Sequence, residues 1–248
     1  MKLTVLGNNG PYPAENGATS SYLMTFDDGV KVVLDMGSGA FSNLLKNDNP
    51  SFVDAVIISH LHYDHISDLG IYCYYLQFKS GQKPVLFFPE KTEFTENIEK
   101  TATFTVKYYN DSDSFQIGEN IFSFKKVKHP VTTYAVKIKE KDKKFVYTGD
   151  SNFCPAIDEL FSDCNVALCD SCFLSSQWKE KAPHMSVKGV CELGQKYGVK
   201  VILTHFNPET DKKLIEKESF GDYEISEINK SYTIGEKSQI LGLRNRSF

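Results

Sequence analysis

The chain has 248 residues, of which 41% are hydrophobic and 24% are charged, as in ordinary globular proteins with one large core or two closely joined halves. Its net charge of -4 argues against a general binder of nucleic acid or of membrane surfaces. No segment approaches the roughly 20 apolar residues of a membrane span, and the first residues resemble a strand rather than a signal peptide.

The six cysteines are too sparse for the disulfide framework of a small secreted protein. We therefore expect reduced thiols and a cytoplasmic location. Cys169 and Cys172 have C-x-x-C spacing. A structural zinc site would require a second such pair, and a thioredoxin-like site would place the pair at the start of a helix. We interpret both as buried or incidental thiols.

The predicted elements of the first half are strands separated by turns, followed by helices. Strands are predicted at residues 3–6, 21–26, 31–35 and 55–58, and helices at residues 40–46 and 68–78. The run at 55–58 is continuously apolar, which is typical of a strand buried on both faces. The helix at 68–78 is rich in tyrosine, and we interpret it as a core-packing or dimer-contact helix rather than a platform for stacking bases.

The second half repeats this order of elements. Strands are predicted at residues 104–108, 121–126, 134–138, 144–147, 166–169 and 200–204, helices at about 157–161, 186–197 and 210–218, and one or two short strands near the end. Strands and helices in both halves predict a single domain of two α/β halves, residues 1–115 and 116–248, packed sheet to sheet with helices outside.

Four of the predicted buried strands lead into a polar residue that can do chemistry. These residues are His60, Asp150, Asp170 and His205. The carboxyl ends of strands form the edge at which open α/β sheets bind ligands. We therefore expect the four side chains to contribute to one site.

A cluster of histidines follows the strand at 55–58, in the sequence HLHYDH. His60 and His62 are two residues apart, so in an extended segment they project to the same side and can meet one metal. Asp64 and His65 fall where the chain turns into a helix and can reach a second metal. Burying these groups unpaired would cost several kcal/mol, and zinc, which accepts imidazole and carboxylate ligands, removes that cost. Asp150 can bridge two such metals.

The chain resembles the metallo-β-lactamase-fold hydrolases, and most of all their ribonuclease Z and small phosphodiesterase branch. The matching segments occur in the family's order at residues 34–39 (LDMGSG), 59–65 (SHLHYDH), 128–130 (KHP), 147–150 (YTGD) and 203–206 (LTHF). The resemblance implies an α/β fold: a four-layer αββα sandwich with two mixed β-sheets, outer helices and an active site along one edge.

The resemblance also assigns metal ligands. It implies that the first zinc is held by His60, His62 and His129, that the second is held by Asp64, His65 and His205, and that Asp150 bridges the two. Taken alone, His129 and His205 would more often be structural histidines, and it is the preceding cluster that makes them candidate ligands. Mn²⁺ or Fe²⁺ are alternatives to zinc.

His184 is the remaining histidine, and its segment resembles the H-x-S/T motif of ribonuclease Z-like enzymes. In those enzymes this residue is not a ligand but protonates the leaving oxygen or stabilises the phosphate. A histidine suits this work because it titrates near neutral pH. It also precedes a predicted helix N-terminus, where anions gather, and Ser186 can cap that helix. Asp170 can orient His184. The candidate catalytic residues are therefore His184, Asp170 and Asp64. A surface histidine at the start of a helix is the alternative.

The chain departs from ribonuclease Z in one respect. His129 and Asp150 are 21 residues apart, which leaves no room for the long glycine- and proline-rich arm that grips tRNA in that enzyme. The chemistry is expected to persist without the means of holding a large folded RNA.

The resulting hypothesis is a dizinc phosphodiesterase that cleaves a small or single-stranded phosphodiester, such as a cyclic nucleotide or an RNA 3′ end. A metal-bridging hydroxide attacks phosphorus and His184 acts as general acid. The alternatives are tRNA 3′ processing of the ribonuclease Z type, hydrolysis of a lactone, thioester or β-lactam, and metal binding without turnover. A homodimer is expected by analogy with related enzymes, and no membrane partner is expected.

Overall fold

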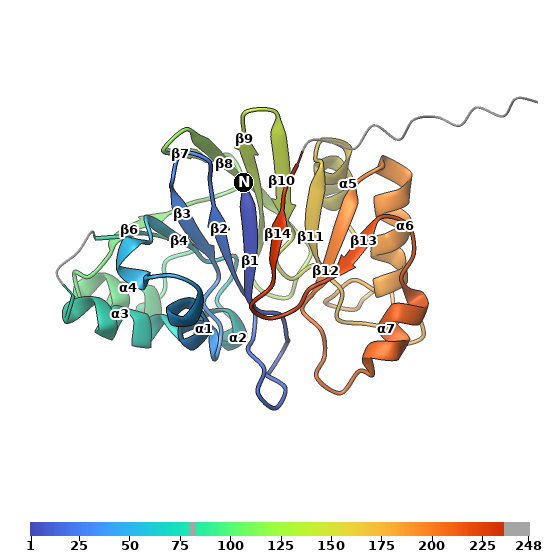
Figure 1. Cartoon of the computed structure of the whole chain (residues 1–248), viewed down its shortest axis with the longest axis horizontal. Coiled ribbons are helices and arrows are strands. Elements are labelled where there is room, and N and C mark those ends of the chain that lie inside the picture. Colours follow the sequence, from blue (N-terminus) through green and yellow to red (C-terminus); the bar gives the residue numbers. More distant parts are fainter. Residues whose placement is uncertain (80–82, 236–248) are drawn as a thin grey trace, which may run out of the picture.

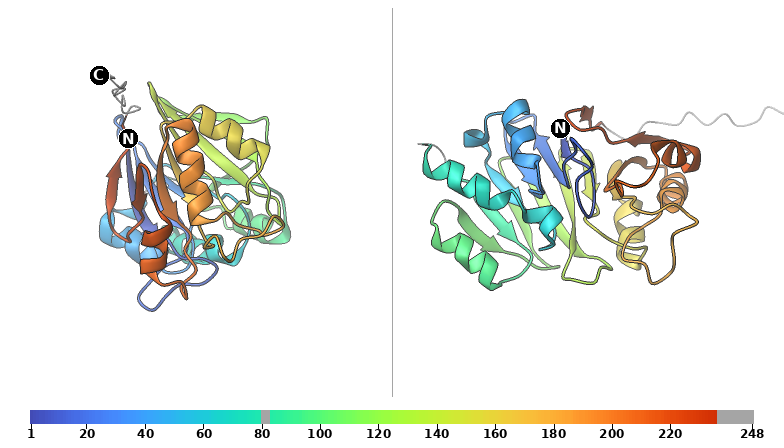
Figure 2. Two further views of the ribbon diagram at one scale, coloured as in Figure 1. Left: turned by 90° about the vertical axis from the view of Figure 1, so that its right-hand side faces the viewer. Right: turned by 90° about the horizontal axis from the view of Figure 1, so that it is seen from below.

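Two β-sheets of seven strands each lie face to face at the centre of the computed structural model, which describes residues 1–79 and 83–235 (Figures 1 and 2). Helices cover the outer faces of both sheets (Figure 2). The predicted αββα sandwich is therefore confirmed.

The first sheet has the strand order β14-β1-β2-β3-β4-β5-β6. Its strands are β1 (Lys2–Gly7), β2 (Ser21–Thr25), β3 (Lys31–Leu34), β4 (Ala55–Ile57), β5 (Val85–Phe88), β6 (Thr105–Tyr108) and β14 (Ser231–Thr233). Strands β14 to β3 pair antiparallel and β3 to β6 pair parallel. Strand β14 joins this sheet from the far end of the chain, because it pairs with β1.

The second sheet has the order β13-β12-β11-β10-β9-β8-β7. Its strands are β7 (Ser114–Ile117), β8 (Asn120–Lys126), β9 (Tyr134–Glu140), β10 (Lys143–Tyr147), β11 (Val166–Asp170), β12 (Lys200–Thr204) and β13 (Tyr223–Ile225). It repeats the mixed pattern of the first sheet, with antiparallel pairs from β7 to β10 and parallel pairs from β10 to β13.

The helices divide between the two outer faces (Figure 2). The first sheet carries α1 (Ala40–Asn47), α2 (Tyr63–Ile66), α3 (Leu69–Gln77) and α4 (Glu93–Lys100), with a short 3-10 turn η1 (Pro50–Phe52), and the second carries α5 (Pro155–Ser162), α6 (Val187–Tyr197) and α7 (Lys212–Glu218). None of these helices, which are all those of the described part of the chain, has the length and apolar character that crossing a membrane requires.

The core consists of one hydrophobic cluster between the sheets and one beneath the helices on either side. In β3, Val32 and Leu34 face the central cluster, whereas Val33 faces the helices of the first sheet. In β10, Phe145 faces the central cluster and Val146 faces the opposite way. Apolar residues on both faces of a strand explain the continuous apolar runs in the sequence.

Five elements of the described structure are absent from the sequence prediction: η1, α2, β5, α4 and β7. Helix α4 has a mostly polar sequence, and only Thr95 and Ile98 are buried in it, so few apolar residues mark it in the sequence. Strand β7 lies at the edge of its sheet and has no buried residue. Tertiary contacts rather than a buried apolar run therefore fix β7.

Candidate metal centre

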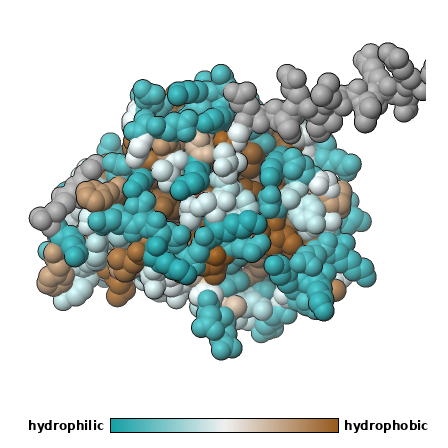
Figure 3. Space-filling view, in the orientation of Figure 1, coloured by the Kyte–Doolittle hydropathy of each residue, from teal (hydrophilic) through white to brown (hydrophobic). Residues whose placement is uncertain are grey.

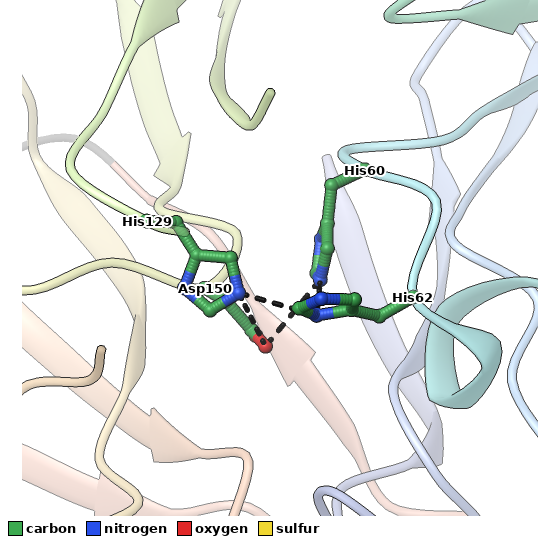
Figure 4. Close-up of side chains that lie close together, drawn as sticks. All are labelled: His60, His62, His129 and Asp150. Atoms are coloured by element: carbon green, nitrogen blue, oxygen red, sulfur yellow. Dashed lines mark hydrogen bonds and ion pairs between the residues drawn. The ribbon is translucent and has the colours of Figure 1, made fainter. Parts of the chain in front are cut away.

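The first group of candidate ligands consists of three histidines and one carboxylate. His60 and His62 follow β4, His129 follows β8, and Asp150 follows β10. The ligand atoms of all four lie within 4.8 Å of one another. Nδ1 of His62 lies 3.1 Å from Nε2 of His60 and 3.2 Å from Nε2 of His129. The side chains point toward a common centre from both sheets (Figure 4).

The second group shares Asp150 and adds residues from α2 and the end of β12. It consists of Asp64, His65, Asp150 and His205, again with ligand atoms within 4.8 Å. Nε2 of His65 lies 3.3 Å from Oδ1 of Asp150 and 3.5 Å from Oδ2 of Asp64. Nε2 of His205 lies 3.3 Å from Oδ2 of Asp150. All seven candidate ligands are thus brought together, with Asp150 between the two groups.

The unpaired atoms of the second group are those that a cation would contact. Oδ2 of Asp64, Nε2 of His65 and Nε2 of His205 are buried and have no hydrogen-bond partner among the described residues. Leaving such atoms unpaired is costly, and imidazole nitrogens with carboxylate oxygens are the donor set that divalent transition metals prefer. The residues therefore fit a pair of divalent metal ions.

The outer nitrogen of His65 is held by a residue that the sequence analysis did not select, Asp35 at the end of β3. Nδ1 of His65 donates to Oδ2 of Asp35 over 2.7 Å. The same carboxylate accepts from the Ser59 backbone and hydroxyl and from the Tyr147 hydroxyl, over 2.6, 2.7 and 2.7 Å. Such a partner fixes the imidazole so that Nε2 faces the centre. Only the LDMGSG segment pointed to this position.

The outer nitrogens of two other histidines also have partners. Nδ1 of His129 donates to the Pro183 carbonyl over 3.1 Å, and Nδ1 of His205 lies 2.9 Å from the Ser20 hydroxyl. Each ring therefore directs Nε2 inward, which is the arrangement expected of metal-binding histidines. The sequence contains no local signal for either partner.

The charges of the cluster are set by burial and by mutual proximity. Burial, and the neighbouring His65, hold the pKa of His60 well below its usual range, so this ring is neutral and able to bind a metal. Burial opposes ionisation of Asp150, but His205 and His65 outweigh it and hold its pKa well below normal. Burial likewise opposes the charge on His65, but Asp150 and Asp35 raise its pKa well above normal. Only the neutral form of His65 offers a nitrogen lone pair to a metal.

His184 lies beside the cluster and is paired with Asp170, as the sequence analysis expected. Its Nδ1 donates to Oδ2 of Asp170 over 2.7 Å, and Asp170 is itself fixed by the backbone amides of Ser151 and Cys172, over 3.0 and 3.1 Å. Burial lowers the pKa of His184, but the charge and hydrogen bond of Asp170 outweigh it and raise the pKa to about 9.

The ring of His184 also stacks on His205 with centroids 5.0 Å apart, which places it against the second group. Ser186 begins α6 as its cap, because its side chain accepts from the Gly189 amide. The helix therefore starts three residues after His184, at Val187, and its cap fixes the chain there.

Cys172 lies closer to the centre than its interpretation as a buried or incidental thiol suggested. Its sulfur lies within 4.8 Å of ring nitrogens of His184 and His205. Both Cys169 and Cys172 are free and buried. Burial raises the pKa of the Cys172 thiol far above the neutral range, so this side chain is an uncharged neighbour of the site. The C-x-x-C spacing could not reveal this proximity.

Two mixed sheets in an αββα sandwich, with a histidine and aspartate cluster at one edge, define a metallo-hydrolase of the metallo-β-lactamase fold. The chain belongs to the family described as anti-Pycsar protein Apyc1, whose model matches residues 1–227. It is thus a metal-binding hydrolase of the ribonuclease Z-like branch.

Relatives in sequence and structure agree with this assignment. The chain is 32% identical over 219 residues to the "Probable metallo-hydrolase YhfI" of Bacillus subtilis, covering 83% of this chain and 86% of the relative. The crystal structure of YhfI superposes with a TM-score of 0.84 and 27% identity, over 94% of this chain and 99% of that one. A ribonuclease Z of Oceanobacillus iheyensis is 28% identical over 58% of this chain and 51% of its own. The short form of human tRNase Z shares the fold, with a TM-score of 0.78 and 15% identity, over 95% and 100% of the two chains.

Proposed function

We propose that this hydrolase is a dizinc phosphodiesterase that acts on a small or single-stranded phosphodiester, such as a cyclic nucleotide or an RNA 3′ end. The observation that carries the proposal is the hydrogen bond of 2.7 Å between His184 and Asp170 beside the metal cluster. A histidine held in this way is suited to protonate a leaving oxygen.

The metal ligands proposed for the centre follow the two groups. His60, His62 and His129 would hold the first metal, Asp64, His65 and His205 would hold the second, and Asp150 would serve both. When bound, a pair of divalent ions supplies Lewis acidity toward the phosphoryl oxygens and activates water as the nucleophile. Mn²⁺ or Fe²⁺ could occupy the same donors, because nitrogen and oxygen ligands bind all three ions.

The role proposed for His184 depends on its two ring nitrogens. Nδ1 donates to Asp170, so Nε2 carries the proton that remains to be given away. With a pKa of about 9, the ring is protonated at neutral pH. The ribose alkoxide released from a cyclic nucleotide is a poor leaving group, and a proton from Nε2 converts it to an alcohol as the P–O bond breaks.

The proposed substrate is small because the structure has little to hold a large one. Strands β9 and β10 are joined by a tight turn at Lys141 and Asp142, where ribonuclease Z carries its tRNA-gripping arm. The net charge of the chain is -4, which disfavours phosphate-rich partners. A small phosphodiester meets neither obstacle, and a single-stranded RNA 3′ end needs no arm that grips a folded tRNA.

The proposed oligomer is a homodimer that forms through α3. Ile71 and Tyr74 in this helix and Phe78 just after it have 58, 61 and 70% of their surfaces exposed. Hydrophobic residues are visible at the lower left of the molecular surface, over this helix (Figure 3). Clustered bulky apolar side chains of this kind are typical of protein interfaces.

The test combines metal content with turnover. We expect about two zinc ions per chain by mass spectrometry, hydrolysis of bis(p-nitrophenyl) phosphate and of a cyclic 3′,5′-mononucleotide, and a large loss of cyclic nucleotide hydrolysis in His184→Ala. Lys188→Ala, an exposed change in α6, is the matched control and should retain activity.

Other results would select the alternatives. Cleavage of a precursor tRNA at a single site would favour processing of the ribonuclease Z type. Two metals with lactone or thioester hydrolysis, and full activity in His184→Ala, would replace the phosphodiesterase proposal. Two metals with no turnover of any of these substrates would indicate a metal-binding protein.

A further inference from the structure

The loop between β1 and β2, residues 8–20, is attached to the residue that follows His205. The Gly10 amide donates to the Phe206 carbonyl over 3.1 Å, and the Phe206 amide donates to the Asn8 carbonyl over 2.8 Å. These two bonds connect segments nearly 200 positions apart in the sequence. The loop therefore lies against the second group of candidate ligands, at His205.

Gly10 lies directly against the imidazole of His205. A Cβ atom at this position would lie 2.5 Å from Nδ1 of His205 and closer still to Cε1 and Nε2, which is far inside van der Waals contact. The backbone of Gly10 does not have a positive φ. The glycine is thus required for space rather than for backbone conformation, because the histidine ring fills the volume of a side chain.

Ser20 holds the same ring from its other nitrogen. Its hydroxyl is fully buried and lies 2.9 Å from Nδ1 of His205. With Nδ1–H donating to this oxygen, the lone pair of Nε2 faces Asp64 and Asp150, where Nε2 has no hydrogen-bond partner among the described residues.

The backbone of His205 also needs support from its surroundings. Its φ is 59°, in the left-handed region, which costs a residue other than glycine about 1–2 kcal/mol. Such a conformation persists when neighbouring contacts determine it. Gly10, Ser20 and the two bonds around Phe206 are contacts of that kind.

We propose that Gly10 and Ser20 are positioning residues for the second metal: they fix the His205 imidazole so that the second metal is bound in place. This inference rests on the dinuclear centre proposed above. Within the described residues, neither Gly10 nor Ser20 hydrogen bonds to His60, His62 or His129. A change in the loop should therefore weaken binding of the second metal and leave binding of the first metal unchanged.

The experiment measures metal binding and needs no substrate. Metal-free wild type, Gly10→Ala and Ser20→Ala are titrated with Zn²⁺ by calorimetry, and metal content is measured after dialysis. Wild type should bind two ions. Ser20→Ala should bind the second ion about 10–100-fold more weakly, the usual effect of removing a partner of a ligating histidine. Gly10→Ala should retain one ion and lose the other.

Two controls separate positioning from general damage. Gly70→Ala places a methyl group in open space on α3 and should bind two ions as wild type does. The melting temperature of each metal-free variant reports on folding. If Gly10→Ala does not fold, Ser20→Ala tests the inference alone, because it removes only one hydroxyl.

The outcomes distinguish this inference from the function on which it rests. Two ions of wild-type affinity in both loop variants would overturn the inference and leave the dinuclear centre intact. Equal weakening of both ions would overturn the selective role of the loop. Fewer than two ions on wild type would overturn the dinuclear centre and the inference with it.

Discussion

Asp170 determines the pH range over which His184, the proposed general acid, carries its proton. The carboxylate raises the pKa of the histidine to about 9 against the opposing effect of burial, so the ring is charged below that pH and loses its proton above it. Removing the carboxylate charge lowers the pKa, and the acid form is then lost at a lower pH.

For Asp170→Asn we therefore predict that the alkaline limb of kcat/KM for a cyclic nucleotide moves to lower pH. The acid form should disappear nearer the ordinary histidine pKa of about 6.5. The measurement is a pH–rate profile of wild type and variant, with Lys188→Ala as the control that should not shift. An alkaline limb at the same pH in Asp170→Asn would contradict the assignment of His184 as the acid.

The leaving group should determine how much His184 matters. For His184→Ala we predict a loss of about 10²–10⁴-fold with a cyclic nucleotide, whose alkoxide requires protonation. The loss with bis(p-nitrophenyl) phosphate should be much smaller, because p-nitrophenolate departs without a proton. The measurement is kcat for both substrates with both proteins. An equal loss for the two would point to a role in binding or in structure instead.

Asp35 is expected to stabilise the fold as well as the site, because its buried carboxylate accepts hydrogen bonds from Ser59, His65 and Tyr147. Asn tolerates the left-handed backbone of this position, where φ is 56°, so Asp35→Asn tests the side chain alone. We predict a loss of about 3 kcal/mol in metal-free protein, against about 1 kcal/mol for Tyr147→Phe. Urea unfolding of both variants measures the difference, and equal losses would show that Asp35 does not organise the network.

At the scale of elements, the buried strands and the residues that end them were predictable. The apolar runs of β4, β10, β11 and β12 are visible in the sequence because both faces of these strands are buried. His60 and Asp150 each follow a strand at the carboxyl edge of its own sheet, and the packing of one sheet on the other brings the two residues together. Strand β7 was not predictable, because an edge strand without buried residues leaves no such pattern.

The supports of the metal ligands were predictable only in part. The pairing of His184 with Asp170 follows from two polar residues near the same sheet edge. His205 contacts Gly10 and Ser20 from the other sheet, and these residues are 185 positions or more away in the sequence. Neither the serine nor the glycine belongs to a local sequence pattern that would predict the contact. Tertiary packing alone decides such contacts.

Helix α3 should carry the dimer contact. For Phe78→Glu and Tyr74→Glu we predict monomers, because a charge placed at an apolar interface must lose its hydration. Ile121→Glu, an exposed change on β8 with 42% exposure, is the matched control and should leave the dimer intact. Sedimentation velocity measures the mass in each case. A wild-type monomer, or a dimer that survives both α3 variants, would contradict the proposed interface.

At the scale of the whole molecule, the two sheets share one core. Val32 and Leu34 of the first sheet lie in the same hydrophobic cluster as Val136 and Phe145 of the second. We therefore propose that the two halves form a single domain and unfold together.

Removing the metals should lower the stability of this domain without unfolding it. We predict that a chelator abolishes hydrolysis and lowers the melting temperature. The decrease should grow with the concentration of Zn²⁺ in the reference sample, because ions that bind only the folded state stabilise it by mass action. This stabilisation is about 4 kcal/mol at a free ion concentration of 1,000 times Kd. Circular dichroism should retain its helix and sheet signals, because the three hydrophobic clusters do not involve the ligands. Unfolding of the metal-free protein at room temperature would contradict this prediction.

The pairing of β14 with β1 affects how the chain folds during its synthesis. Strand β1 leaves the ribosome more than 220 residues before its partner at Ser231–Thr233. Until then the first sheet has an unpaired edge at β1, and exposed strand edges are where nascent chains associate wrongly. Strand β14 therefore closes a sheet that began to form long before it was synthesised, and the interval between the two strands is when a growing chain would gain most from a chaperone.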